Sequence, residues 1–143
     1  MLARIHPVAG VIGLLTILTF WTSTVLTELF GSEAAVRAVK LAIPWGLPVL
    51  VLALALTGAG GFRLAGGSTD PIIAAKKRRM PFIAGNGLLV LIPSAITLAV
   101  LAGADRFGAA FYGVQALELT AGAVNIVLMS LNARDGRRLR ARG

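Results

Sequence analysis

The chain contains no cysteine, a single histidine and few charged residues for its length. The absence of cysteine excludes disulfides, thiol nucleophiles and thiolate metal sites. Charged residues make up 14% of the 143 positions, against about 25% in an ordinary soluble domain. No catalytic motif stands out, and the longest polar connection runs only from Arg63 to Met80. The chain therefore has no room for a sizeable domain outside a membrane.

Long apolar stretches dominate what is present. The chain is 57% hydrophobic, and its mean hydropathy is +0.83. A helix that crosses a bilayer needs about 20 mostly apolar residues, and it must satisfy its own backbone hydrogen bonds within lipid. Four stretches meet this length, at about 7–30, 36–62, 81–103 and 107–131. The pattern predicts an all-α integral membrane protein, with one transmembrane domain over 1–133 and a basic, frayed tail over 134–143.

The distribution of basic residues predicts the orientation of the helices. Eleven of the fourteen Lys and Arg residues fall at the N-terminus, between the second and third stretches, or in the tail. The other three are Arg37, Lys40 and Arg106. Because the richer side stays in the cytoplasm and short links join antiparallel neighbours, we expect an antiparallel four-helix bundle with both termini cytoplasmic. The expected location is the bacterial inner membrane.

Basic residues that flank apolar runs also indicate a partner. They are typical of contact with anionic lipid headgroups. Nucleic acid is not expected as a partner, because Arg78 and Arg79 have no aromatic residues interleaved with them.

A stripe of polar residues runs along the last apolar stretch, 107–131. Its members, at spacings of three and four residues, are Gln115, Glu118, Gly122, Asn125 and Met129. Such a row lies on one face of a helix and must face the bundle interior, a cavity or another subunit. The residues expected to form a buried polar network are Gln115, Glu118 and Asn125, with Asn86 and Lys40 from other helices.

Among the residues of this stripe, Glu118 costs the most free energy to place inside a membrane. It lies about 12 residues, or roughly 18 Å, from the outer end of its helix. An ionisable residue at that depth costs roughly 2.5–3.5 kcal/mol on insertion scales. Lys40 is the best candidate partner, while Glu28 could compete for it. Two interpretations follow: a satisfied buried polar residue that sets the helix register, or a proton or cation site that serves transport through a cavity.

His6 allows a haem hypothesis. Gly10 and Gly13 follow it near the same helical face and could leave room for a flat macrocycle. A b-type haem would need a second axial ligand, either a methionine or His6 of a second copy. The further residues of this hypothesis are Met80 and Met129 as ligands, and Arg4, Arg78 and Arg79 as partners of the propionates. The alternative is a histidine at the membrane interface that caps the first helix.

Several short segments resemble those of a group of small bacterial four-helix inner-membrane proteins that has no established activity. The segments are Arg4-Ile5-His6-Pro7, Thr19-Phe20-Trp21, Glu28-Leu29-Phe30-Gly31, Lys77-Arg78-Arg79-Met80-Pro81 and Gln115-Ala116-Leu117-Glu118-Leu119.

The segments Arg4-Ile5-His6 and Arg37 to Pro44 also resemble the first two helices of membrane-bound, haem-containing protoporphyrinogen oxidases. This chain departs from that family, because it lacks the further histidines and the tyrosine-rich end of the first helix. The oxidase activity is therefore not carried over.

Three functions remain open from the sequence. The first is a non-enzymatic role as an accessory subunit or homo-oligomer of the membrane. The second is a haem-b redox protein or oxidase that uses His6. The third is small-molecule or proton transport at Glu118.

Overall fold

The computed structural model describes residues 2–142, and the side chains from Ile5 onward. Within that range the chain is helical, with short turns and no strand. The elements are α1 (Leu2–Phe30), α2 (Glu33–Ala65), α3 (Pro71–Asn86), the π-helical turn η1 (Gly87–Leu91), α4 (Ile92–Gly103) and α5 (Ala109–Arg140).

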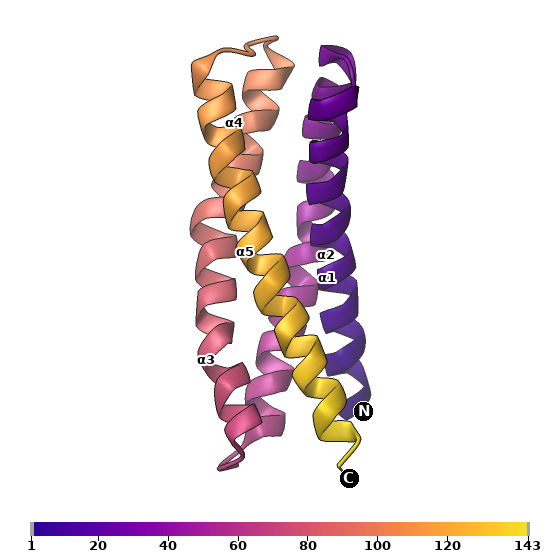
Figure 1. Ribbon diagram of the computed structural model, residues 1–143, viewed down its shortest axis with the longest axis vertical. Coiled ribbons are helices and arrows are strands. Elements are labelled where there is room, and N and C mark those ends of the chain that lie inside the picture. Colours follow the sequence, from indigo (N-terminus) through magenta and orange to yellow (C-terminus); the bar gives the residue numbers. More distant parts are fainter. Residues whose placement is uncertain (1, 143) are drawn as a thin grey trace.

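Four long rods lie side by side in the molecule (Figure 1). The third rod is continuous and consists of α3, η1 and α4. α1 packs along α2, while α5 contacts α1, α3, η1 and α4. The two ends of the chain lie at the same end of the molecule, and the links 31–32 and 104–108 lie at the other (Figure 1).

Capping residues explain where the helices begin. The Ser32 side chain accepts a hydrogen bond from the Ala35 amide at 3.3 Å, and the Asp70 carboxylate accepts one from Ile72 at 2.7 Å. These contacts satisfy amides that have no partner within the first turn of a helix. Pro71 follows Asp70 at the first helical position, where the amide that proline lacks is not needed.

α2 ends at Ala65 and is capped by Gly66, whose φ of +45° is a conformation that glycine adopts without strain. The carbonyl of Gly66 accepts a hydrogen bond of 2.9 Å from Lys77 Nζ. This contact ties the start of α3 to the end of α2, so the two helices meet at the end of the molecule that carries the termini.

The third rod widens into a π-turn just before Pro93. The amide of Ile92 bonds to the carbonyl of Gly87, five residues earlier. A proline inside a helix lacks a donor and crowds the carbonyl four residues before it. The wider turn accommodates that crowding without ending the helix.

Two small apolar clusters hold the rods together. The larger is built around Ile17, Leu50, Ile83 and Leu91, and the smaller around Leu98 and Phe111. Large apolar side chains such as Leu89 and Val100 instead face outward. All four rods are long and apolar enough to cross a membrane. This outward-facing apolar surface is what lipid would cover.

The structure corrects several predicted boundaries. α1 includes Pro7 rather than beginning there, and α2 runs on to Ala65. The third rod begins at Pro71 instead of position 81, so the basic residues 76–79 lie within α3 and not in a loop. The tail expected to fray over 134–143 is helical as far as Arg140. Basic residues in the last turn of α5 favour this extension, because they interact well with the helix C-terminus.

Candidate functional site

The most buried charge in the described chain is Lys40 of α2. Its side chain is 1% exposed and forms an ion pair with the Glu118 carboxylate of α5, which is 13% exposed. Lys40 Nζ also donates a 3.2 Å hydrogen bond to Thr24 Oγ1 of α1. The structure confirms the pairing of Lys40 with Glu118, and it adds Thr24 as a third member from a third helix.

A second polar contact lies beside this pair. Gln115 Nε2 donates to Glu28 Oε1 at 2.8 Å, which joins α5 to the end of α1. Glu28 lies close enough to Lys40 to interact with it electrostatically. Among the described residues, Gln115 Oε1 is the buried side-chain polar atom that has no hydrogen-bond partner. Two carboxylates and one ammonium therefore share this region, which we call the charge cluster (Thr24, Glu28, Lys40, Gln115 and Glu118).

The formal charges of the charge cluster do not cancel. Lys40 balances one of the two carboxylates, which leaves one negative charge when both are ionised. Arg37, one turn before Lys40, does not supply the missing charge. It donates to both Asp105 oxygens, at 2.7 and 2.9 Å, on the surface of the link between α4 and α5. The cluster thus has the composition of a site that can hold one proton or one monovalent cation.

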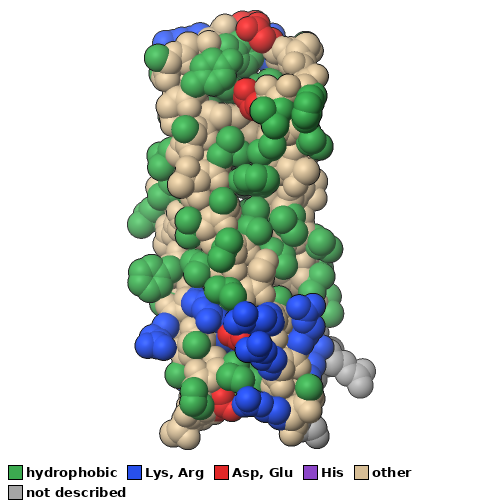
Figure 2. Space-filling model, in the orientation of Figure 1, with side chains coloured by type: hydrophobic (Ala, Val, Ile, Leu, Met, Phe, Trp, Pro, Cys, Tyr) green, Lys and Arg blue, Asp and Glu red, His purple; other side chains and the backbone are tan. Residues whose placement is uncertain are grey.

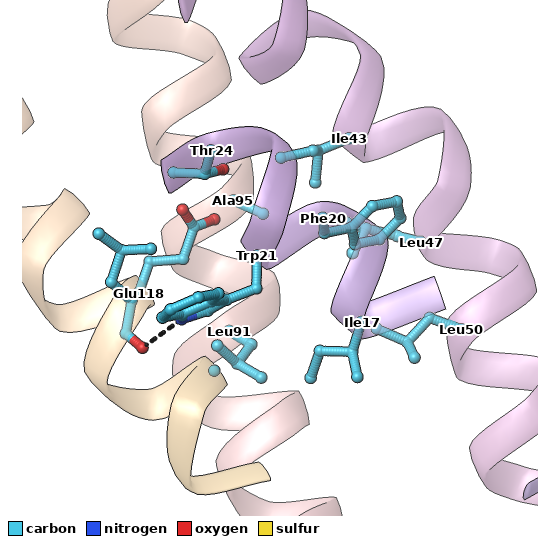
Figure 3. Close-up of a pocket in the computed structure, with 12 residues that line it drawn as sticks. Ile17, Phe20, Trp21, Thr24, Ile43, Leu47, Leu50, Leu91, Ala95 and Glu118 are labelled. Atoms are coloured by element: carbon cyan, nitrogen blue, oxygen red, sulfur yellow. Dashed lines mark hydrogen bonds between the residues drawn. The ribbon is translucent and has the colours of Figure 1, made fainter. Parts of the chain in front are cut away.

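A small cavity of about 40 Å³ lies next to Glu118. Figure 3 shows the Glu118 side chain on the same side of this cavity as Thr24. Trp21, Leu91 and Ile17 line the other sides of the cavity. A cavity needs about 10–15 Å³ to hold a water molecule, and a water needs two or more polar partners. The walls are mainly apolar, so Glu118 and Thr24 supply the polar contacts.

Trp21 lines the cavity beside Glu118 and Thr24. Its indole Nε1 donates a 2.9 Å hydrogen bond to the backbone carbonyl of Leu119 (Figure 3). A Cβ added to Gly122 would lie 3.0 Å from Trp21 Cδ1, so a larger residue here would require the indole to move by a few tenths of an ångström. This close approach favours glycine at the position of the polar stripe between Glu118 and Asn125.

A neutral polar contact links α5 to the third rod. Asn125 is 0% exposed, accepts a 2.9 Å hydrogen bond from Asn86 Nδ2 and donates a 3.2 Å bond to the Ile83 carbonyl. Asn86 Nδ2 also donates to the Ala121 carbonyl at 2.8 Å. The predicted polar network therefore divides into two groups, with Asn86 and Asn125 apart from the charge cluster.

A third polar group lies toward the ends of the chain and was not predicted. Arg79 Nη1 donates to Asp135 Oδ2 at 2.7 Å and to Asn132 Oδ1 at 3.2 Å. The Asp135 side chain is 7% exposed although it belongs to the predicted tail. Asn132 lies three residues after Met129 and Asp135 three residues after Asn132, so both continue the spacing of the α5 stripe, which is the signal that could have identified Asp135.

His6 packs directly against α2. Its ring Nδ1 donates a 2.9 Å hydrogen bond to the Thr57 carbonyl. A Cβ added to Gly61 would lie 3.1 Å from His6 Cε1, and one added to Gly60 would lie 3.2 Å from His6 Cβ. The small residues next to the histidine therefore belong to α2, and the imidazole itself fills the space that they leave.

The other residues of the haem hypothesis are not arranged around a shared slot. Gly10 faces Thr57, and a Cβ added to Gly13 would lie 3.4 Å from Met129 Cε in the core. The sulfur of Met80 accepts a 3.6 Å hydrogen bond from Asn132.

The basic residues of that hypothesis also have other surroundings. Arg79 binds Asp135, Arg78 is exposed, and the side chain of Arg4 lies outside the described residues. These contacts do not fit a haem between His6 and a methionine.

Comparison with protein-family models, with curated proteins and with solved structures finds no match for this chain. Both resemblances noted in the sequence therefore stay predictions.

Proposed function

We propose that this chain is a multi-pass protein of the bacterial inner membrane, folded as an antiparallel four-helix bundle with both termini in the cytoplasm. Four helices that are long and apolar enough to cross a bilayer support the location. The short links 31–32 and 104–108 support antiparallel neighbours. The concentration of Lys and Arg at the end that carries the termini supports the orientation (Figure 2).

Within the membrane we propose a non-enzymatic role that depends on contact with another protein surface, as a homo-oligomer or as an accessory subunit. The charged and amide side chains in the α5 stripe make contacts inside the chain: Glu118 with Lys40, Asn125 with Asn86, and Asp135 with Arg79. The polar stripe is thus an internal seam, which leaves an apolar exterior for contact with lipid or a partner.

One residue carries this proposal. Trp45 of α2 is 86% exposed. It lies twelve residues after the start of α2 at Glu33, roughly 18 Å along the helix, near the middle of a hydrocarbon core about 30 Å thick. Exposed tryptophans normally occur at the two interfaces, where the indole N–H meets water or headgroups. Among the described residues Trp45 Nε1 has no hydrogen-bond acceptor. Lipid tails offer none, so a partner surface that supplies an acceptor would remove the free-energy cost of an unpaired N–H group.

The neighbouring exposed residues extend this surface. Leu41, Val49 and Leu52 are exposed and share a face of α2 with Trp45 at spacings of three and four residues. This apolar face, together with the indole, is where we expect a second copy or a partner subunit to pack.

The mass of the protein in nanodiscs, with and without Trp45→Leu, tests this proposal. We expect the parent to occur as a dimer or a larger assembly, and the variant to shift toward the monomer. Phe82→Leu is the matched control, because Phe82 is also a highly exposed aromatic residue but lies on α3. A parent that is monomeric and carries no partner at native expression would contradict the proposal.

Proton or small-cation transport at Glu118 is a second candidate function. The uncompensated charge of the charge cluster favours it, as do the unpartnered Gln115 oxygen and the adjacent cavity. Proteoliposomes that carry a pH-sensitive dye inside test this candidate. Transport requires a proton flux in the parent that Glu118→Gln abolishes, whereas a purely structural cluster gives equal traces for both proteins.

A further inference from the structure

A half-enclosed groove lies between α2 and the third rod. It has a volume of about 330 Å³ and extends from Leu47 to Phe62 on α2 and from Met80 to Ile92 on the third rod. Its walls are apolar, and Asn125 lies at its floor with both of its polar groups already hydrogen-bonded. We call this feature the α2–α3 groove.

The groove exists because α2 and α3 pack lightly along this length. α2 packs closely on α1 and α4 but has fewer contacts with α3. Small residues face the gap, among them Ala55, Gly58, Ala59 and Ala84. Ala55, Ala59 and Ala84 are exposed, so the groove opens sideways rather than into the bundle. A hydrocarbon chain could therefore enter it from the surrounding lipid.

Two unpaired cations lie at one end of the groove. Arg63 lies four residues after Ala59, which lines the groove, so the two share a face of α2. Arg78 lies three residues before Pro81, which lines the groove on α3. Both arginines are exposed, and neither forms an ion pair with a carboxylate in the described part of the chain. A phosphate bound between the two guanidinium groups would accept paired hydrogen bonds from each of them.

We propose that the α2–α3 groove binds one acidic glycerophospholipid, with an acyl chain in the groove and its phosphate between Arg63 and Arg78. The groove is long enough for an acyl chain of one leaflet and extends beyond it. The sixteen positions 47–62 of α2 span roughly 22–24 Å, whereas one leaflet of the hydrocarbon core is about 15 Å thick. A volume near 330 Å³ is within the range of about 300–1,000 Å³ typical of small-ligand pockets.

The charge decides between an acidic lipid and a neutral one. A basic residue near the surface of an anionic membrane contributes about 1 kcal/mol, and basic pockets between helices on the cytoplasmic side bind anionic headgroups. Lys77 adds a third cation nearby, although its ammonium already donates to the Gly66 carbonyl. This inference rests on the proposed membrane location, but it does not depend on an oligomer, because Trp45 is not among the residues that line the groove.

Native mass spectrometry of the detergent-purified protein tests the site, with phosphatidylglycerol and phosphatidylcholine added in equal amounts. We expect the parent to retain one phosphatidylglycerol. Arg63→Gln with Arg78→Gln should weaken that binding by roughly 10- to 30-fold and remove the preference over phosphatidylcholine. Ala84→Leu, which places a side chain in the groove, should reduce retention of both lipids.

Two control variants separate the groove from general effects. Arg137→Gln with Arg138→Gln removes the same charge near the end of α5, and Ala116→Leu enlarges an exposed alanine of α5 outside the groove. Both should bind lipid like the parent, and circular dichroism should show equal helicity for every variant.

Equal lipid retention by the parent and both groove variants would overturn the proposal. The proposal would also be overturned if a second copy of the protein, rather than lipid, occupied the groove and were displaced by Ala84→Leu. A protein that stays monodisperse without detergent would instead contradict the membrane location itself.

Discussion

Lys40 on α2 and Glu118 on α5 form an ion pair across the interior of the bundle, and Lys40 is 1% exposed. The attraction between such charges is offset by the cost of removing both from water, so the pair adds little net stability. Removal of one partner is different, because it leaves the other charge buried and unpaired. The pair therefore makes the relative position of α2 and α5 sensitive to single substitutions.

Single and double substitutions at this pair should give very different stabilities. Lys40→Met should lower the free energy of unfolding by about 3–5 kcal/mol, because Glu118 is left without a cation. Glu118→Leu should cost more than Glu118→Gln, since glutamine keeps an oxygen that can accept from Lys40. Lys40→Met combined with Glu118→Leu should recover most of the loss. Unfolding of the detergent-solubilised variants by denaturant, followed by circular dichroism, measures this cycle. Additive losses in the double variant would contradict a coupled pair.

The contact of Arg79 with Asp135 should be worth more than an exposed ion pair of similar length. Asp135→Asn removes a buried carboxylate that pairs with Arg79 and Arg134, so we expect a loss of about 1–3 kcal/mol in unfolding free energy. Asp105→Asn is the matched control, because Asp105 binds Arg37 at the same 2.7 Å but is 65% exposed. Its loss should stay below about 1 kcal/mol. Thermal unfolding monitored in detergent compares the two, and equal shifts would show that burial does not distinguish the pairs.

Counting along the sequence was enough to predict the helical class, the four apolar stretches and the pairing of Lys40 with Glu118. Both residues lie at depths that can be counted from the ends of their helices, and no other cation lies at that depth. Asp135 was missed because the apolar run ends at Leu131, although the spacing of the α5 stripe continues beyond it. The link between Arg79 and Asp135 then holds the predicted tail against α3.

The rotation of each helix about its axis was not accessible from the sequence. Small residues occur near His6 on α1 and, independently, at Gly60 and Gly61 on α2, and only packing decides which of them face the imidazole. The π-turn before Pro93 was also not predictable from the sequence, because a proline predicts a distortion but not whether the helix bends or widens. The α2–α3 groove depends on the rotation of the helices and on the π-turn, so no sequence pattern indicated it.

The contacts of His6 lead to a spectroscopic prediction. Its ring donates to the Thr57 carbonyl and packs on Gly60 and Gly61, so a macrocycle would have to displace α2. The protein purified from cells supplied with a haem precursor and reduced with dithionite should show no sharp α band. A band in the parent that His6→Ala abolishes would contradict this arrangement and restore the haem hypothesis.

Gly46 should be among the glycines least tolerant of a side chain. A Cβ at this position would lie 2.5 Å from Cζ of Phe20, whose ring packs against the larger apolar cluster between α1 and α2. Alanine is intrinsically better than glycine inside a helix by about 1 kcal/mol, but overpacking typically costs about 1–3 kcal/mol. Gly46→Ala should therefore destabilise the protein, while Gly113→Ala, with no atom within 4 Å of the added Cβ, should be neutral or stabilising. Gly46→Ala combined with Phe20→Leu should be more stable than Gly46→Ala alone, because the shorter side chain relieves the clash. Denaturant unfolding of the four proteins decides the matter, and a Gly46→Ala variant as stable as Gly113→Ala would show that α1 and α2 do not approach as closely as 2.5 Å implies.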